Sequence, residues 1–344
     1  MLKPISNPPN PWESTHVEYL GEPPEARLEV FEEESRSILA ENESPDVGFR
    51  WSINPYRGCF HACSYCYART SHEYLGFGAG TDFDRKIVVK VNAPQLLRAE
   101  LSRRSWKGET IIFSGNTDCY QPLEAVYELT RRCLEICAEF RNPVAIITKG
   151  ALVRRDVDLL ARMSREGSVS VALSIPFSDD AMSRAIEPNA SLPSQRFETL
   201  RLLGAAGIRT SVGVAPVIPG LNDSQISAVL ERARSAGATS AFMTLVRLAG
   251  QTLPVFRERL EQAFPQRASK IWTAIQQVRG GKLNESQFGL RMRGVGPRWG
   301  AIHDLFELEC RRLGFNEERV GEGNEDEEET TFLRPGEQGE LWEL

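Results

Sequence analysis

The sequence predicts an α/β fold in which six strand–helix repeats form an open, partial (β/α)6 barrel. Short runs rich in Val, Ile and Thr recur along the middle of the chain, and amphipathic segments with a period of about 3.6 residues lie between or after them. The runs are apolar almost throughout, as expected for strands of a parallel sheet whose two faces are covered by helices. Six repeats are too few for a closed eight-stranded TIM barrel, so a TIM-like partial barrel is favoured and a doubly wound sheet is the alternative.

The repeats can be placed along the chain one by one. The predicted strands lie at residues 47–53, 110–114, 144–148, 169–175, 208–218 and 239–246. The predicted helices lie near residues 94–105, 122–140, 153–166, 195–206, 223–236 and 254–279. Pro94 and Pro122 suit the first turn of a helix, and Gly204 and Gly207 suit the end of one. In either architecture, ligands are expected at the carboxyl ends of the strands, where candidate chemical residues should gather.

Composition divides the chain into four segments. Residues 1–45 are rich in Pro and Glu and are expected to form a partly disordered N-terminal arm. Residues 46–250 hold the repeats and form the predicted core barrel, and residues 251–316 form a predicted C-terminal helical extension. Residues 317–344 include five consecutive acidic side chains, Glu325–Glu329, and are expected to be an acidic, disordered tail.

Length and composition exclude some classes of protein. Of the 344 residues, 41% are hydrophobic and 26% charged, the balance of a globular protein. No run approaches the roughly 18 apolar residues of a membrane helix, and the N-terminus lacks the apolar region of a secretory signal. We therefore expect a cytoplasmic protein that does not interact with membranes.

The net charge of −6 is unevenly distributed. Residues 1–50 and 317–344 each carry 11 acidic side chains, against 4 and 2 basic ones, whereas residues 51–316 carry 35 basic and 25 acidic ones. Such a basic body suits an anionic partner such as DNA or RNA. Solvated outer helices rich in Arg are the alternative explanation.

Three cysteines lie within eight residues, at Cys59, Cys63 and Cys66. Thiolates at this C-x3-C-x2-C spacing can converge from one loop onto one inorganic cluster. A [4Fe–4S] cluster normally takes four Cys ligands, so three would leave one iron open to another ligand. A structural zinc site is the alternative; His61 lies inside the loop, but no second cysteine pair follows at a suitable spacing.

The cysteine spacing, with Tyr65 before the third cysteine, after the first strand of a six-fold repeat, resembles the radical S-adenosylmethionine (SAM) superfamily. This resemblance implies a [4Fe–4S] cluster whose open iron is chelated by the amino and carboxylate groups of SAM. The reduced cluster would cleave SAM to methionine and a 5′-deoxyadenosyl radical, which abstracts hydrogen from a substrate. It also implies an electron donor resembling flavodoxin or ferredoxin.

Within that superfamily, the surroundings look most like the spore photoproduct lyase branch and its DNA repair photolyase relatives. The similarity rests on the stretches Cys66–Arg69, Ser114–Glu124 and Thr148-Lys149. It implies that SAM is bound by Tyr65, Ser114, Lys149, Ser174 and Ala215. It also implies that Tyr67 lies near the radical and the substrate. Helix caps, core hydroxyls and aromatic packing are the structural alternatives for these side chains.

A hydrogen-atom donor is the point at which this sequence departs from the lyases. Their donor cysteine lies two residues before the serine equivalent to Ser114, where this chain has Ile112. Cys119 is the candidate substitute, and a buried thiol without a chemical role is the alternative. The departure puts the photoproduct reaction itself in doubt.

The sequence thus predicts a radical SAM enzyme with a lyase-like reaction, acting on nucleic acid. Modification of a peptide or small metabolite is the alternative substrate hypothesis. A non-catalytic, metal-containing nucleic-acid-binding protein is the alternative of another class. Charged residues that follow strands (Arg184, Glu187 and Arg247) and the basic stretch at 291–299 are further candidates for substrate contacts.

Overall fold

The computed structural model describes residues 8, 10–12, 27–317 and 330–336. Its main sheet has seven strands in the order β10-β9-β8-β7-β6-β3-β2. These strands are β2 (Leu39–Glu41), β3 (Trp51–Ile53), β6 (Ile111–Phe113), β7 (Val144–Thr148), β8 (Val169–Ser174), β9 (Arg209–Val217) and β10 (Ser240–Leu245). All six predicted strands are present in this sheet.

The strand order decides between the two predicted architectures. From β3 to β10, each strand pairs in parallel with the next one of the sheet along the chain. A doubly wound sheet would reverse direction at a switch point, whereas a barrel adds its strands in sequence. The partial (β/α)6 barrel is therefore confirmed, with β2 added antiparallel to β3 at one edge.

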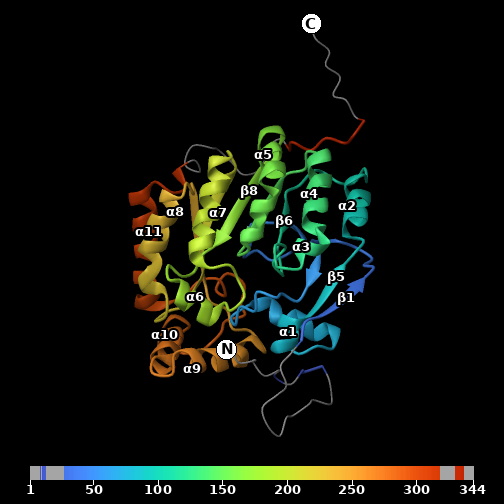
Figure 1. Ribbon diagram of the computed structural model, residues 1–344. Helices are drawn as coiled ribbons and strands as arrows, with labels where there is room; N and C mark the ends of the chain where they lie inside the picture. Colours follow the sequence, from blue (N-terminus) through green and yellow to red (C-terminus); the bar gives the residue numbers. More distant parts are fainter. Residues whose placement is uncertain (1–7, 9, 13–26, 318–329, 337–344) are drawn as a thin grey trace.

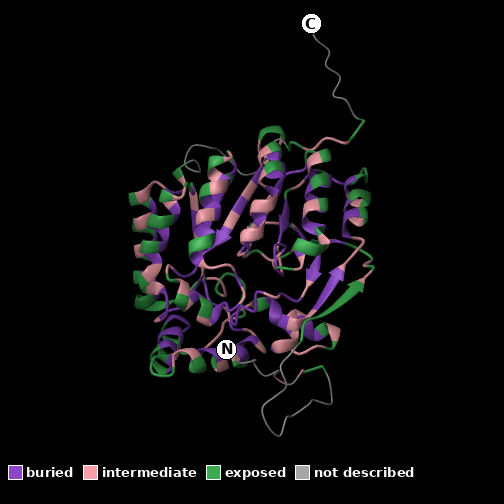
Figure 2. Cartoon of the chain, in the orientation of Figure 1, coloured by how far each residue is buried: buried purple, intermediate pink, exposed green. Residues whose placement is uncertain are grey.

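Helices cover the outside of the barrel, as Figure 1 shows for α2, α4, α5, α7 and α8. The helices are α1 (Thr81–Arg85), α2 (Ala93–Leu101), α3 (Glu124–Tyr127), α4 (Leu129–Glu139), α5 (Val157–Glu166), α6 (Asp180–Ile186), α7 (Pro193–Ala205), α8 (Ile226–Ser235), α9 (Thr252–Ala263), α10 (Ala268–Val278) and α11 (Gly296–Leu313). Three 3-10 helices complete the set: η1 (Tyr67–Leu75), η2 (Ala151–Asp156) and η3 (Asp223–Gln225). In Figure 2 most strands of the main sheet and the inner helix faces are buried, whereas β1 and the outer helix faces are exposed.

Two predicted helices are each broken into two. The segment 122–140 divides at Glu128, whose backbone has φ 53°. The buried Glu124 carboxylate accepts the N–H groups of Thr130 and Arg131 there, which starts α4 afresh. The segment 254–279 divides between α9 and α10 around Pro265, which cannot donate a helical hydrogen bond.

A second sheet was not foreseen. It has the order β1-β5-β4 and consists of β1 (Glu29–Glu33), β4 (Tyr56–Arg57) and β5 (Lys86–Lys90). β1 belongs to the predicted arm, and its charged sequence gives it little strand character. β4 leads directly into residues 58–66, the segment that carries Cys59, Cys63 and Cys66 and is called the cysteine loop below. The second sheet therefore anchors one end of this loop.

The predicted disorder of the two ends falls largely on residues 1–7, 9, 13–26, 318–329 and 337–344, which lie outside the described part of the chain. Residues 330–336 pack on the barrel. Phe332 stacks on Phe140, with ring centroids 6.1 Å apart, and the Leu333 N–H donates to the Phe140 carbonyl. Among the described helices, none has the length and apolar character needed to cross a membrane.

The free edge of β10 is covered by residues 284–293. The N–H of Leu245 donates to the Met292 carbonyl, and the Leu248 N–H donates to the Asn284 side chain. Arg291 pairs with Asp46 from the loop between β2 and β3. Because β2 and β10 are opposite edges of the sheet, this ion pair links the two sides of the open barrel.

Candidate active site

The cysteine loop runs from β4 to η1, beyond the carboxyl end of β3. Gly58 begins it with φ 77°, and a Cβ there would lie 2.9 Å from the Lys86 carbonyl oxygen, so only glycine fits. The next residue, Cys59, donates its N–H to the Phe83 carbonyl at 2.9 Å. The Gln121 side chain joins the loop to the segment after β6: it accepts from the Phe60 N–H and donates to the Gly58 carbonyl.

Arg69 holds the far end of the loop. Its guanidinium is fully buried and donates to the carbonyls of Cys63, Ala79 and Gly80. It also pairs with the Asp84 carboxylate at 2.8 Å. The buried charge is thus neutralised and its donors are used, as a buried arginine requires.

The three loop thiols are packed against protein. Cys59 and Cys63 are each 7% exposed, Cys66 is somewhat more open, and all seven cysteines of the chain are free. Burial raises the pKa of all three loop thiols, while the Lys149 ammonium opposes this for Cys63 and Cys66. The loop thiols are therefore protonated in the metal-free protein, and a metal cluster would bind them by displacing their protons.

Asp118 joins the loop to the barrel. Its Oδ2 lies 3.3 Å from His61 Nδ1 and accepts the Lys149 N–H at 2.8 Å. Its Oδ1 accepts the Thr148 hydroxyl at 2.6 Å. Burial alone would raise the pKa of Asp118, but the nearby His61 and these hydrogen bonds hold it well below its usual range.

Behind the loop lies a buried ion pair that Tyr65 contacts directly. The Tyr65 hydroxyl donates to Glu187, whose other carboxylate oxygen lies 2.5 Å from Arg196 Nη2. Arg196 also donates to the Ser174 carbonyl, at the carboxyl end of β8. Although burial raises the pKa of Glu187, Arg196 and Lys149 lower it below its usual range. Tyr65 and Ser174 are therefore positioned by the same pair of charges.

Lys149 follows β7 and lies over Tyr65, with Nζ 5.7 Å from the ring centroid. Its backbone is fixed by Asp118 on one side and by Gly150 on the other. A Cβ at position 150 would lie 2.4 Å from the Tyr120 carbonyl oxygen, so this turn needs glycine. The ammonium thus lies near the cysteine loop, where its charge acts on Cys63 and Cys66.

Ser114 and Tyr67 meet the loop that follows β6. The Ser114 hydroxyl accepts the Cys119 N–H at 2.8 Å, and its backbone has φ 72°. Tyr67 is 46% exposed, and its hydroxyl donates to the Gly115 carbonyl at 2.7 Å. Ala215 lies in β9, two residues beyond Gly213, which pairs with Ser174 in the neighbouring strand. The candidates from β6, β8 and β9 therefore lie on adjacent parts of one sheet.

The structure does not bring Cys119 to the barrel mouth. Its side chain has no exposed area and belongs to the main hydrophobic core. Burial raises the pKa of its thiol well above the usual value for cysteine. The expectation that Cys119 donates a hydrogen atom to a substrate is therefore not supported. Ile112, at the position where the lyases were expected to carry that donor, is 7% exposed.

The loop offers three thiols and one imidazole as donors for a metal. His61 Nδ1 lies 3.3 Å from the Asp118 carboxylate, which orients the imidazole ring. Within the described ranges, no three Cys, His, Asp or Glu side chains meet as ligands of one metal ion. In a four-iron cluster each thiolate binds a different iron, so its thiols need not converge on one point.

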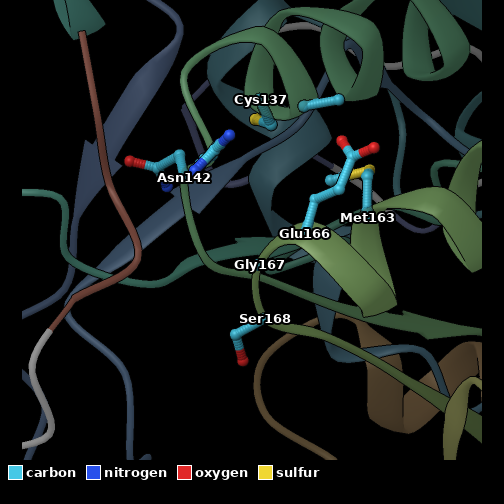
Figure 3. A pocket seen from close by; sticks show the side chains of 8 residues that line it. Cys137, Asn142, Met163, Glu166, Gly167 and Ser168 are labelled. Atoms are coloured by element: carbon cyan, nitrogen blue, oxygen red, sulfur yellow. The ribbon is translucent and has the colours of Figure 1, made fainter. Parts of the chain in front are cut away.

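A small pocket lies elsewhere, between α4, α5 and the connections that precede β7 and β8 (Figure 3). Cys137, Asn142 and Ser168 are among its lining residues. Because Asn142 and Ser168 precede their strands, this pocket lies at the amino ends of the strands. Ligands of such barrels bind at the opposite ends, so this pocket is not the candidate site.

Comparison with known proteins identifies the family. Residues 53–233, more than half of the chain, match the family described as the radical SAM superfamily. The chain belongs to this superfamily. Membership implies a [4Fe–4S] cluster and SAM as cofactors, as the cysteine spacing predicts. An uncharacterised protein of Mycobacterium tuberculosis is 41% identical over 224 residues, which cover 64% of this chain and 66% of that protein.

Other radical SAM proteins share the fold or part of the sequence. A radical SAM Nalpha-GlyT isomerase of Pseudomonas phage M6 is 26% identical over 76% of this chain and 51% of its own. Spore photoproduct lyase in complex with dinucleoside spore photoproduct has a TM-score of 0.60 at 15% identity, covering 83% of this chain and 80% of its own. A tyrosine-to-phenylalanine mutant of a spore photoproduct lyase gives 0.61 at 15% identity, with 88% of each chain covered.

Sequence reasoning missed the residues that support the site from a distance. Arg196 lies inside α7, and its helical position gave no sign that it neutralises Glu187. Asp118 was not singled out, because its acceptance of the Lys149 N–H depends on the pairing of β6 with β7. The position of Arg196 on the apolar side of its helix was the sequence feature that could have indicated a buried charge with a partner.

Replacing Glu187 with Gln is predicted to destabilise the fold by about 3–5 kcal/mol, because it leaves the Arg196 charge buried and unpaired. Urea unfolding measures the change. The control is Glu198→Gln, which removes an exposed pair with Arg201 on the same helix and should cost less than about 1 kcal/mol. Equal effects of the two variants would contradict the structural role given to the buried pair.

Proposed function

We propose that this protein is a radical SAM enzyme whose cluster is held by Cys59, Cys63 and Cys66, and whose substrate is a nucleic acid. The observation that carries the proposal is the arrangement of the three thiols beside Lys149 and Tyr65, beyond the carboxyl ends of the strands. When bound, the cluster and SAM supply an electron that cleaves SAM, giving a 5′-deoxyadenosyl radical that takes hydrogen from a substrate.

The remaining residues are proposed to bind and orient. The Lys149 ammonium would pair with the carboxylate of SAM, since it is the cation that lies over the Tyr65 ring. Tyr65 would lie against the adenine, with its hydroxyl held by Glu187. Ser114, Ser174 and Ala215 would line the same space from β6, β8 and β9. The low exposure of the loop thiols would keep water from the reacting groups.

Tyr67 is proposed to face the substrate. It follows the third loop cysteine directly, it is 46% exposed, and its hydroxyl is held by Gly115. With Cys119 in the core, it is the exposed residue next to the loop that can donate a hydrogen atom. The enzyme also needs a reductant, for which a protein resembling flavodoxin or ferredoxin is proposed.

Nucleic acid is favoured as substrate by two observations. The structural neighbours include a lyase bound to a dinucleoside photoproduct. The body of the chain, residues 51–316, carries ten more basic than acidic side chains, which suits an anionic substrate. A peptide or small metabolite is the second candidate, favoured by Ile112 at the position of the lyase donor cysteine.

Cys63→Ala is predicted to lower the iron and acid-labile sulfide content of anaerobically reconstituted protein to a small fraction of the wild-type value, because two thiolates do not hold the cluster. Cys137→Ala is the control, since it removes a fully buried thiol outside the loop. It should keep the full iron content. Iron retained in the Cys63 variant, or zinc in place of iron in the wild type, would refute the ligand assignment.

Lys149→Ala is predicted to weaken SAM binding to the reconstituted, unreduced protein about tenfold or more, because a charge-assisted contact is lost. Lys149→Arg keeps the charge and should lose less. Isothermal titration calorimetry measures the affinity, and Lys282→Ala, which removes an exposed lysine paired with Glu285, is the control. An unchanged affinity in Lys149→Ala would show that this ammonium does not contact SAM.

The substrate class is tested by the yield of 5′-deoxyadenosine from reduced protein and SAM. Oligodeoxynucleotides carrying modified or damaged bases are predicted to raise this yield several-fold, with hydrogen from the oligonucleotide recovered in the product. Peptides of equal net charge serve as the control for a purely electrostatic effect. Stimulation by peptides and not by oligonucleotides would replace the nucleic-acid proposal with the second candidate.

A further inference from the structure

A cluster of three arginines lies beside the barrel mouth. It consists of Arg247, directly after β10, Arg279, at the end of α10, and Arg291, in the segment along the edge of β10. Arg291 pairs with Asp46, which also accepts the Gly289 N–H at 2.6 Å. Among the described residues, Asp46 is the acidic side chain in direct contact with the cluster, so the three guanidinium groups outnumber their counter-charges.

The donors of Arg279 are directed inward. Its two terminal nitrogens donate to the carbonyls of Val246, Leu290, Arg291 and Arg293. These bonds close the segment 290–293 over the end of β10. Arg279 therefore has a structural use, although it contributes positive charge to the cluster.

Arg247 has no such use. Its Nε is buried and, like the Nε of Arg279, finds no hydrogen-bond partner in the described part of the chain. Unlike those of Arg279, its terminal nitrogens donate to no carbonyl there, and Nη1 makes only a weak contact with Met292 Sδ at 3.8 Å. Its guanidinium carbon lies 5.9 Å from the centre of the Tyr67 ring. Burial, the largest cause, and the neighbouring Arg291 lower the pKa of Arg247, while Tyr67 and Asp46 oppose them. A half-buried guanidinium with unused donors in a positive field is arranged to receive an anion.

We infer that Arg247 binds an anionic oxygen of the substrate, and that this oxygen belongs to a phosphodiester. The place of Arg247 next to Tyr67 would set the anion beside the residue proposed to face the substrate. A guanidinium group best binds a tetrahedral or planar oxyanion that accepts hydrogen bonds from two of its donors. The phosphodiester identity rests on the proposed nucleic-acid function, whereas the anion site rests on the arginine cluster alone.

The anion site is tested first with inorganic phosphate on reconstituted full-length protein. Phosphate should raise the melting temperature of the wild type more than chloride at equal ionic strength does, because it binds the folded state. Arg247→Gln should lose most of this difference. Arg201→Gln, an exposed arginine on the outer face of α7, should keep it and controls for general salt effects. Equal phosphate effects in both variants would overturn the inference.

The phosphodiester is tested with labelled oligothymidylate, followed by fluorescence anisotropy over a range of salt concentrations. Arg247→Gln should weaken binding about tenfold and reduce the salt dependence by about 0.7 in the slope of log K against log salt. Arg247→Lys should keep most of the slope. An uncharged methylphosphonate analogue should bind the wild type and Arg247→Gln alike.

The outcomes separate the inference from the function on which it partly rests. If oligothymidylate binds the wild type and Arg247→Gln with equal affinity and slope, Arg247 is not a phosphate contact, and the nucleic-acid substrate stands. If phosphate protects through Arg247 while oligothymidylate does not bind at all, the anion site stands and the phosphodiester is overturned.

Discussion

The arrangement of the site depends on the Asp118 carboxylate. This group lies after β6 and holds the Lys149 backbone after β7, the Thr148 side chain and, through His61, the cysteine loop. Three segments distant in sequence are therefore fixed relative to one another by one buried charge. Because the charge is satisfied by several donors, it remains ionised despite burial. Through the Lys149 backbone, it fixes the point from which that side chain extends toward Tyr65.

Buried charges recur in this structure wherever the loop meets the barrel. Arg69 with Asp84 and Glu187 with Arg196 lie on opposite sides of the cysteine loop, and both pairs are nearly or fully buried. Such pairs add little net stability, since desolvation offsets their attraction. What they provide is a fixed geometry, because only one arrangement satisfies all their donors and acceptors. Arg247 is the contrast, since its buried Nε lacks a partner among the described residues.

The sequence predicted the parts of the fold and site that depend on local pattern. Continuous apolar runs located the six parallel strands, and the cysteine spacing located the loop. β5, a five-residue run in a region without periodicity, was missed because its strand pairing involves β1 and β4 from elsewhere in the chain. Arg196 and Asp118 were missed for the same reason: their partners are set by tertiary contacts. Cys119 was misjudged because position after a strand does not reveal whether a side chain faces the mouth or the core.

We propose that the thiol loop and Lys149 together support reductive cleavage of SAM. The most direct measurement is the formation of 5′-deoxyadenosine when anaerobically reconstituted protein is mixed with SAM and dithionite. We expect 5′-deoxyadenosine and methionine to form in equal amounts, and only when iron, SAM and reductant are all present. Protein that carries a full complement of iron and binds SAM, but forms no 5′-deoxyadenosine with or without any of the substrate classes, would contradict it.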